Sequence, residues 1–167
     1  MKRRTACALS IFSLSCLVGC STPPSDASLI EAFYAHRPAH ERLHEMLLAD
    51  KQLLLVATWG VETTGSGGRK VPPTADISAA RFQEYLVVLK EIGGEVASKT
   101  RGRDADSDVG VWGSGWAGDT RHIAVSYRTH PPANQVASLD AYRSGPDKRR
   151  EGIYRHVDGN WYIRADW

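Results

Sequence analysis

Cysteine is almost missing from this sequence of 167 residues. Its three cysteines, Cys7, Cys16 and Cys20, all lie within the first twenty positions. The chain after Cys20 therefore has no thiol with which to form a disulfide, bind zinc through sulfur or act as a nucleophile. A domain built from that part must be stabilised by its hydrophobic core, and roughly 140 residues suffice for one domain that buries about two thirds of its surface.

An excess of charge of either sign is missing as well. The whole chain has 21 basic and 19 acidic residues, and removal of the first nineteen residues would leave 18 basic against 19 acidic. The sequence pI of about 8.5 thus partly reflects the N-terminal segment. A nearly neutral chain with interspersed charges gives no reason to expect nucleic acid as a partner.

One long apolar run is present, and it stands at the N-terminus. Lysine and arginines at positions 2–4 precede an apolar stretch at 6–19 (ACALSIFSLSCLVG), which ends in Leu17-Val-Gly-Cys20. A run of about fourteen residues suits the core of a signal peptide and is too short to span a bilayer. The alternative to a specialised signal is an ordinary secretory signal that contains a cysteine by chance.

Leu17-Val-Gly-Cys20 closely resembles the lipobox of bacterial lipoproteins. In that family the cysteine thiol receives a diacylglycerol, the preceding peptide bond is cut, and the new amine is acylated. The resemblance implies a signal peptide at 1–19 and covalent lipid on Cys20. The polar segment with two prolines that follows predicts a tether at 20–27, and the rest shows no internal repeat or second boundary, so a single domain is expected at 28–167. Two or three acyl chains hold a protein firmly to a membrane, because each buried methylene contributes about 0.8 kcal/mol.

The residue after the lipobox cysteine bears on the membrane to which the protein is sorted. This residue is Ser21, and lipoproteins with such a residue, rather than aspartate, tend to reach the outer membrane. The resemblance therefore implies a lipid anchor in the outer membrane with the domain facing the periplasm. Retention in the inner membrane is the alternative. In either case, membrane lipid is the partner that Cys20 implies.

The pattern of apolar residues predicts an α+β fold. A first helix is expected from near Ser28, with a kink or a division into two helices at Pro38. A second helix is expected at 78–92, because Gly93 and Gly94 follow it. Strands are expected at 53–59, 95–100, 109–112, 121–128, 152–157 and 161–165, with a loop at 62–74. This order predicts two helices packed on one face of an antiparallel sheet of about five to six strands.

His40-Glu41-Arg-Leu-His44 matches the H-E-x-x-H motif of zinc proteases. On a helix this spacing places both imidazoles on one face, and the glutamate can polarise a metal-bound water. The context favours a structural role instead. Pro38 lies two residues before His40, inside the helix that a zinc protease would have here, and the longer motif with G-x-x-H after His44 is missing. Counted at about 100° per residue, His36 and His40 fall on the apolar stripe of the helix. We therefore expect these histidines to point into the core and to bind no metal. The alternative is a zinc hydrolase in which His40 and His44 are the metal ligands and Glu41 is the general base.

Three further segments have patterns that suggest a site. Asp104-Ala-Asp-Ser-Asp108 has the spacing that begins a calcium loop, but the later glycine and glutamate are missing, so a solvated hairpin tip is expected. Segment 65–70 (GSGGRK) resembles an anion-binding nest, but it lacks the Walker spacing and is expected to be a flexible loop. Trp112 and Trp116 stand in a glycine-rich connection, where inward-folded indoles are favoured and an exposed aromatic binding surface is the alternative.

Over most of its length the chain after Cys20 resembles small lipoproteins of proteobacteria. Their α+β domain has a histidine-containing first helix and a Trp-Tyr pair near the C-terminus, here Trp161-Tyr162. This resemblance brings no activity with it. We therefore expect a non-enzymatic, membrane-tethered binding module with an envelope protein as partner, for example a periplasmic inhibitor of a secreted toxin. No cofactor is expected beyond the lipid on Cys20, and zinc belongs only to the hydrolase alternative. An envelope-structural lipoprotein is a third alternative.

Overall fold

A computed structural model describes residues 22–65, 67–100, 103–115, 120–145 and 152–167. These residues contain four helices: α1 Asp26–Ala35, α2 Arg37–Ala49, α3 Ala79–Ile92 and α4 Leu139–Ser144. They also contain seven strands: β1 Leu53–Ala57, β2 Gly60–Thr63, β3 Val96–Thr100, β4 Arg103–Ser114, β5 Arg121–Tyr127, β6 Ile153–Asp158 and β7 Trp161–Asp166. The expected signal peptide and lipobox at 1–20, the sorting residue Ser21, and Trp116 lie outside the described residues.

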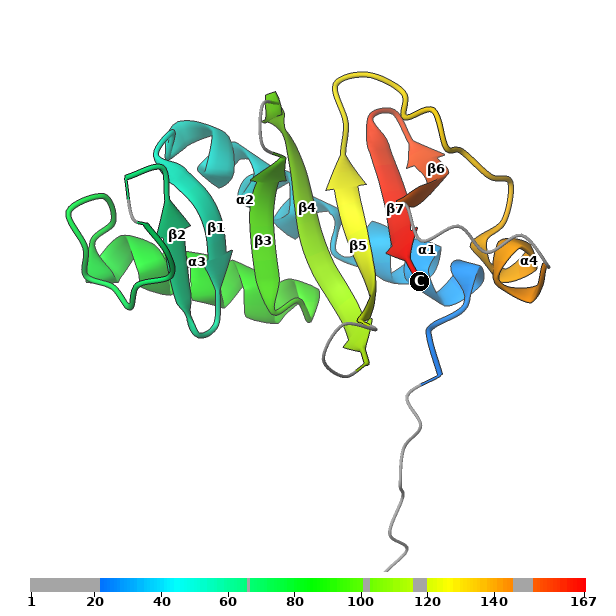
Figure 1. Cartoon of the computed structure of the whole chain (residues 1–167), viewed down its shortest axis with the longest axis horizontal. Coiled ribbons are helices and arrows are strands. Elements are labelled where there is room, and N and C mark those ends of the chain that lie inside the picture. The colour runs from blue at the N-terminus through cyan, green and yellow to red at the C-terminus, as the bar shows by residue number, and fades with distance from the viewer. Residues whose placement is uncertain (1–21, 66, 101–102, 116–119, 146–151) are drawn as a thin grey trace, which may run out of the picture.

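The seven strands form one open sheet in which neighbouring strands are antiparallel, in the order β2-β1-β3-β4-β5-β7-β6. Helices α1, α2 and α3 cover one face of this sheet, while α4 lies beside β6 (Figure 1). The predicted α+β class with an antiparallel sheet is confirmed. The sheet is larger than the expected five to six strands, because β2 lies partly in the segment expected to be a loop. Among the described residues, no helix is long and apolar enough to cross a bilayer.

Pro38 divides the first helical segment into two helices. α1 ends at Ala35, and Pro38 lies in the first turn of α2, where its missing N–H removes no helical hydrogen bond. α1 begins earlier than predicted, because the N-cap is Ser25 rather than Ser28. The Ser25 hydroxyl accepts a hydrogen bond of 3.2 Å from the Ser28 N–H. Three helices therefore cover the sheet where two were expected.

α3 begins and ends where the sequence predicts. Ser78 is its N-cap, and Gly93 ends it in the left-handed conformation with φ 75°, which residues with a Cβ rarely adopt. The end of α2 lies close to β3, where the buried ammonium of Lys99 donates a hydrogen bond of 2.9 Å to the Asp50 carbonyl. A cation suits this position because a helix C-terminus has a partial negative charge.

Two main groups of apolar side chains hold the helices to the sheet. One lies between α2, α3 and the strands from β1 to β4, and includes Leu43, Tyr85 and Leu89. The other lies under α1 and includes Leu29 and Ile163. Burial of each such large side chain contributes about 1.5–3 kcal/mol to stability.

The acidic run at 104–108 is part of β4, so the prediction of a solvated hairpin tip is wrong. Asp106 is buried, and its carboxylate accepts hydrogen bonds from the Thr129 N–H (2.8 Å) and hydroxyl (2.7 Å). Asp108 lies 2.5 Å from the guanidinium of Arg128. Residues two apart share one face of a strand, and the chain that leaves β5 supplies partners for both carboxylates there.

Both outer strands of the sheet have a hydrogen-bonded neighbour on their outer side. Val61 of β2 exchanges two backbone hydrogen bonds of 2.8 Å with Lys70. Tyr154 of β6 donates to the Asn134 carbonyl and accepts from the Val136 N–H, also at 2.8 Å. Part of the segment predicted to be a free loop at 65–70 is thus paired with the sheet.

Candidate functional site

His40 projects from α2 into the core. Its side chain is 2% exposed, and its ring lies 5.5 Å from that of Phe33 and 6.0 Å from that of Trp161, measured between centroids. Burial, helped by the charge of His36, lowers the pKa of His40 to about 4. The ring is therefore neutral at physiological pH. Its Nδ1 is buried without a hydrogen-bond partner.

His44 lies one turn further along α2 and is also buried. Its ring stacks on Tyr127 at a centroid distance of 4.0 Å, and its Nδ1 lies 2.9 Å from the Ser107 hydroxyl on β4. Burial lowers the pKa of His44, although nearby acidic groups partly offset the effect.

The sequence predicted that His36 and His40 lie on the apolar face of the helix, directed into the core. His40 is buried as predicted, but His36 is only partly buried, because the break between α1 and α2 changes the phase of the stripe.

The third residue of the motif, Glu41, lies on the solvent side of α2. Its carboxylate accepts a hydrogen bond of 2.8 Å from the Arg37 Nε. A zinc hydrolase needs the two histidines and the glutamate around one open metal position, whereas here the glutamate and the two histidines lie on different sides of the helix. In the described parts of the chain, no group of three or more histidine, cysteine, aspartate or glutamate side chains could hold a metal ion.

The sheet face opposite the helices carries a row of ionic contacts, which we name the ionic row. It begins at Arg128, which is 3% exposed and lies 2.5 Å from Asp108. The other oxygen of Asp108 lies 3.6 Å from Arg164. Arg164 lies 2.9 Å from Asp166, and Asp166 lies 2.6 Å from the Nε2 of His122. The row thus connects side chains of β4, β5 and β7.

Asp166 fixes the orientation of His122 at one end of the ionic row. Burial raises the pKa of Asp166, but the contact with His122 and the charge of Arg164 outweigh it and leave this pKa below its ordinary value. The carboxylate is therefore ionised at neutral pH. This carboxylate faces Nε2 of the His122 ring.

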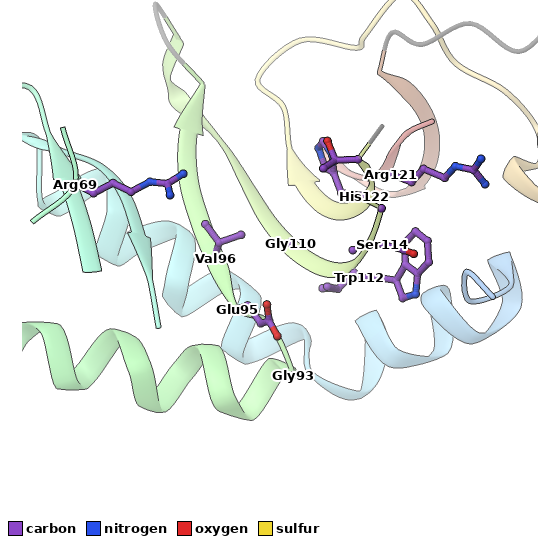
Figure 2. Close-up of a pocket in the computed structure, with 13 residues that line it drawn as sticks. Arg69, Gly93, Glu95, Val96, Gly110, Trp112, Ser114, Arg121 and His122 are labelled. Atoms are coloured by element: carbon purple, nitrogen blue, oxygen red, sulfur yellow. The ribbon is translucent and has the colours of Figure 1, made fainter. Parts of the chain in front are cut away.

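A groove of about 880 Å³ adjoins the ionic row where β3 and β5 begin and β4 ends. The open-face groove, as we name it, is lined among others by Arg69, Glu95, Val96, Trp112, Arg121 and His122 (Figure 2). Strand register places Val96 and His122 on the sheet face opposite the helices, because the adjacent residue Ala97 packs in the core with α2 and α3.

The groove is hollow because β4 has glycines on this face. Gly110 pairs with Val96 on one side and Ala124 on the other, and Gly113 pairs with His122. A Cβ on Gly110 would lie 2.8 Å from the Val96 side chain, whereas the nearest atom to a Cβ on Gly113 would be 3.9 Å away. The close approach of Val96 explains the glycine at 110, and the backbone of β4 becomes the floor of the groove.

Arg69 forms the wall of the groove on the β2 side. Its guanidinium lies 4.1 Å from the centroid of the Trp59 ring, and it points toward β3 in Figure 2, whereas Arg121 points away. Neither arginine has an ion-pair partner among the described residues. The sequence analysis did not single out Arg69 or His122, although the anion-binding alternative for 65–70 concerned the segment that contains Arg69.

Trp112 is partly buried and contributes to both the core and the groove. It pairs with Ile123 and packs against the apolar group under α1, while another part of it lines the groove. Trp112 is therefore neither fully folded into the core nor fully exposed as an aromatic binding surface. The register shift between Gly110 and Trp112 accompanies this intermediate position.

No protein-family model, curated protein or solved structure matches the chain. The class of protein is therefore defined by its own architecture. It is an α+β domain with one sheet face covered by helices and one open face. The open face carries a groove lined by Arg69 and Arg121, to which the described residues supply no ion-pair partner.

Proposed function

We propose that this protein is a membrane-tethered, periplasm-facing binding module that holds an envelope protein in its open-face groove. Lipid on Cys20 tethers the domain to the membrane, with the outer membrane as the expected location. A periplasmic inhibitor of a secreted toxin is one specific form of such a module. The lipobox resemblance at 17–20 supports the tether, and the groove supports the binding role.

The observation that carries the binding role is the shape and lining of the groove. Its floor is bare backbone at Gly110 and Gly113, so a segment of another protein can approach the sheet closely. Its walls combine an apolar surface from Val96 and Trp112 with the hydrogen-bonding groups of Arg69. Tryptophan and arginine are the side chains that contribute most often to the energetic centre of protein interfaces.

The tether is tested by metabolic labelling. Cells that produce the wild-type protein or Cys20→Ser are fed radiolabelled palmitate and then fractionated. We expect label and membrane association for the wild type, and loss of both for the variant, because the thiol is the attachment point for the first lipid. If the two proteins take up label equally and fractionate alike, there is no lipid tether at this position.

The binding role is tested by photo-crosslinking in intact cells. A photoreactive amino acid replaces Gly113 in the groove or, as a control, Val87, which is 62% exposed on α3. Position 113 offers open space for a side chain. We expect a discrete cross-linked protein from position 113 and not from position 87. The same products at both positions, or none at position 113, would contradict the proposed role.

A further inference from the structure

We propose that the open-face groove recognises an acidic segment of its protein partner. A carboxylate of that segment meets the guanidinium of Arg69, and an apolar side chain two residues away packs on Val96. The inference rests on the proposed binding role and specifies the chemistry of the partner. Arg69, Val96 and the glycine floor of β4 carry it.

Arg69 is already oriented for binding. Its guanidinium stacks at 4.1 Å on Trp59, so part of the freedom that a long side chain loses on binding is removed beforehand. A guanidinium presents N–H donors in one plane, and two of them match the two oxygens of a carboxylate. No described residue supplies that carboxylate to Arg69, so its donors are available to a partner.

The charges around the groove favour an acidic partner. Among the described residues that line it, Arg69 is the cation that points toward β3, Arg121 points away (Figure 2), and Glu95 is the acidic side chain. The ionic row beside the groove is internally paired, since Asp108 and Asp166 alternate with Arg128 and Arg164, so its charges largely compensate one another. A guanidinium that has no carboxylate partner among the described residues attracts an acidic ligand, and salt weakens that attraction.

The size and openness of the groove favour a stretch of polypeptide. Its volume of about 880 Å³ lies near the upper end of the range of about 300–1,000 Å³ for ligand pockets. The groove lies on a sheet face rather than inside the fold, and the backbone of Gly110 and Gly113 forms part of its floor. An extended segment can lie along such a floor with alternate side chains directed toward Arg69 and Val96.

Three matched peptides test the inference against the purified domain labelled with nitrogen-15. The acidic probe is acetyl-Glu-Ser-Leu-Ser-Glu-Ser-Leu-amide, in which glutamate and leucine are two residues apart and share one face of an extended chain. The other two peptides carry glutamine or lysine in place of glutamate. We expect the acidic peptide to shift the amide signals of Gly110 and Gly113 saturably. The glutamine peptide should bind about threefold or more weakly, as expected for loss of an exposed charge pair, and the lysine peptide should bind more weakly still. Added salt should reduce the difference.

Two variants that each remove one positive charge test whether Arg69 is responsible for the affinity for the acidic peptide. Arg69→Gln should reduce the affinity for the acidic peptide to that for the glutamine peptide. Arg42→Gln removes the same charge from an exposed position on α2, on the helix side of the sheet, and should leave the affinity unchanged. Unchanged amide spectra away from the groove confirm that both variants are folded. Equal effects of the two variants would mean that only net charge matters, which overturns the assignment of Arg69.

The outcomes separate this inference from the proposed binding role. If a partner cross-links at position 113 but the three peptides bind equally, the binding role stands and the acidic specificity is wrong. If the acidic peptide binds in an Arg69-dependent way but no partner cross-links, the chemistry of the groove stands and the proposed role is wrong. Absence of saturable binding by the acidic peptide, or shifts centred away from Gly110 and Gly113, overturns the inference.

Discussion

The carboxylate of Asp26 accepts a hydrogen bond of 2.9 Å from the backbone N–H of Leu139, which lies 113 residues further along the chain. The same carboxylate accepts a hydrogen bond of 2.8 Å from the Ser138 hydroxyl and lies 2.6 Å from the guanidinium of Arg155. In return, Asp140 accepts a hydrogen bond of 3.0 Å from the Asp26 N–H. The starts of α1 and α4 thus cap each other, and β6 is joined to both.

Asp26→Asn should destabilise the domain strongly. Asp26 is 4% exposed, and the change leaves Arg155 without its charge partner and weakens the cap of α4. We expect the free energy of unfolding to fall by about 3 kcal/mol, as for other broken buried pairs. Urea denaturation measures the effect. Glu31→Gln, at an exposed position on the same helix, is the control and should change stability by less than about 0.5 kcal/mol; similar effects of the two changes would refute the role of Asp26.

His40 should make stability depend on pH. The ordinary pKa of about 6.5 is lowered to about 4 in the fold, so the unfolded chain binds a proton first as the pH falls. The contribution of the neutral His40 ring to stability is therefore fully present above pH 6.5. It is lost as the pH falls from 6.5 to 4, and this lowers the free energy of unfolding by at most about 3 kcal/mol. The lowered pKa of His44 acts in the same direction.

Urea denaturation at several pH values between about 7.5 and 4.5 measures this dependence. His40→Gln should flatten the profile, because the titrating ring is removed, even if the variant is less stable at every pH. His156→Gln changes an exposed histidine of β6 and should keep the wild-type slope. An unchanged slope for His40→Gln would show that the acid sensitivity arises elsewhere.

Removal of the Ser107 hydroxyl should leave the buried Nδ1 of His44 without its partner at 2.9 Å. An unsatisfied buried polar group costs about 1–3 kcal/mol, so Ser107→Ala should lower the unfolding free energy by that amount. Ser98→Ala, on the opposite sheet face, removes the same atom from a partly buried serine and should have little effect. Thermal and urea denaturation of both variants provide the comparison. Equal stabilities would mean that water replaces the hydroxyl at His44.

Gly110→Ala and Gly113→Ala should have opposite effects on stability. A Cβ on Gly110 would lie 2.8 Å from the branched side chain of Val96, and such overpacking costs about 1–3 kcal/mol. A Cβ on Gly113 meets nothing nearer than 3.9 Å, so alanine there should be neutral or add about 0.5–1 kcal/mol by reducing the freedom of the unfolded chain. Urea denaturation measures the free energy of unfolding of both variants and of the wild type. Destabilisation of both to the same extent would contradict the geometry of the groove floor.

The sequence was sufficient to predict elements with strong local signals. α3 has a serine N-cap, an apolar face and a glycine at its end, and Pro38 marks the break between α1 and α2. β2 was missed because its four residues, Gly60–Thr63, are too few to show a periodic pattern, and the strand is defined by its pairing with β1 across a turn. α4 was missed because it is six residues long and its start is capped by Asp26 from the other end of the sequence.

The candidate site was less predictable than the core. Burial of His40 follows from helical periodicity, a property of nearby residues. The groove depends on strand register, which brings Val96, Gly113 and His122 from three strands to one face. The partners of Asp106 and Asp108 likewise come from a segment about twenty residues away, so a motif search around the aspartates could not find them.

The hydrogen bonds that Lys70 makes to β2 and that residues 134 and 136 make to β6 have a consequence for molecules crowded together on one surface. At those positions the backbone N–H and C=O groups are already hydrogen-bonded. A strand of a neighbouring copy therefore cannot pair there to extend the sheet from one molecule into the next. At these positions a neighbouring molecule can contact the sheet through side chains but not by adding a hydrogen-bonded strand.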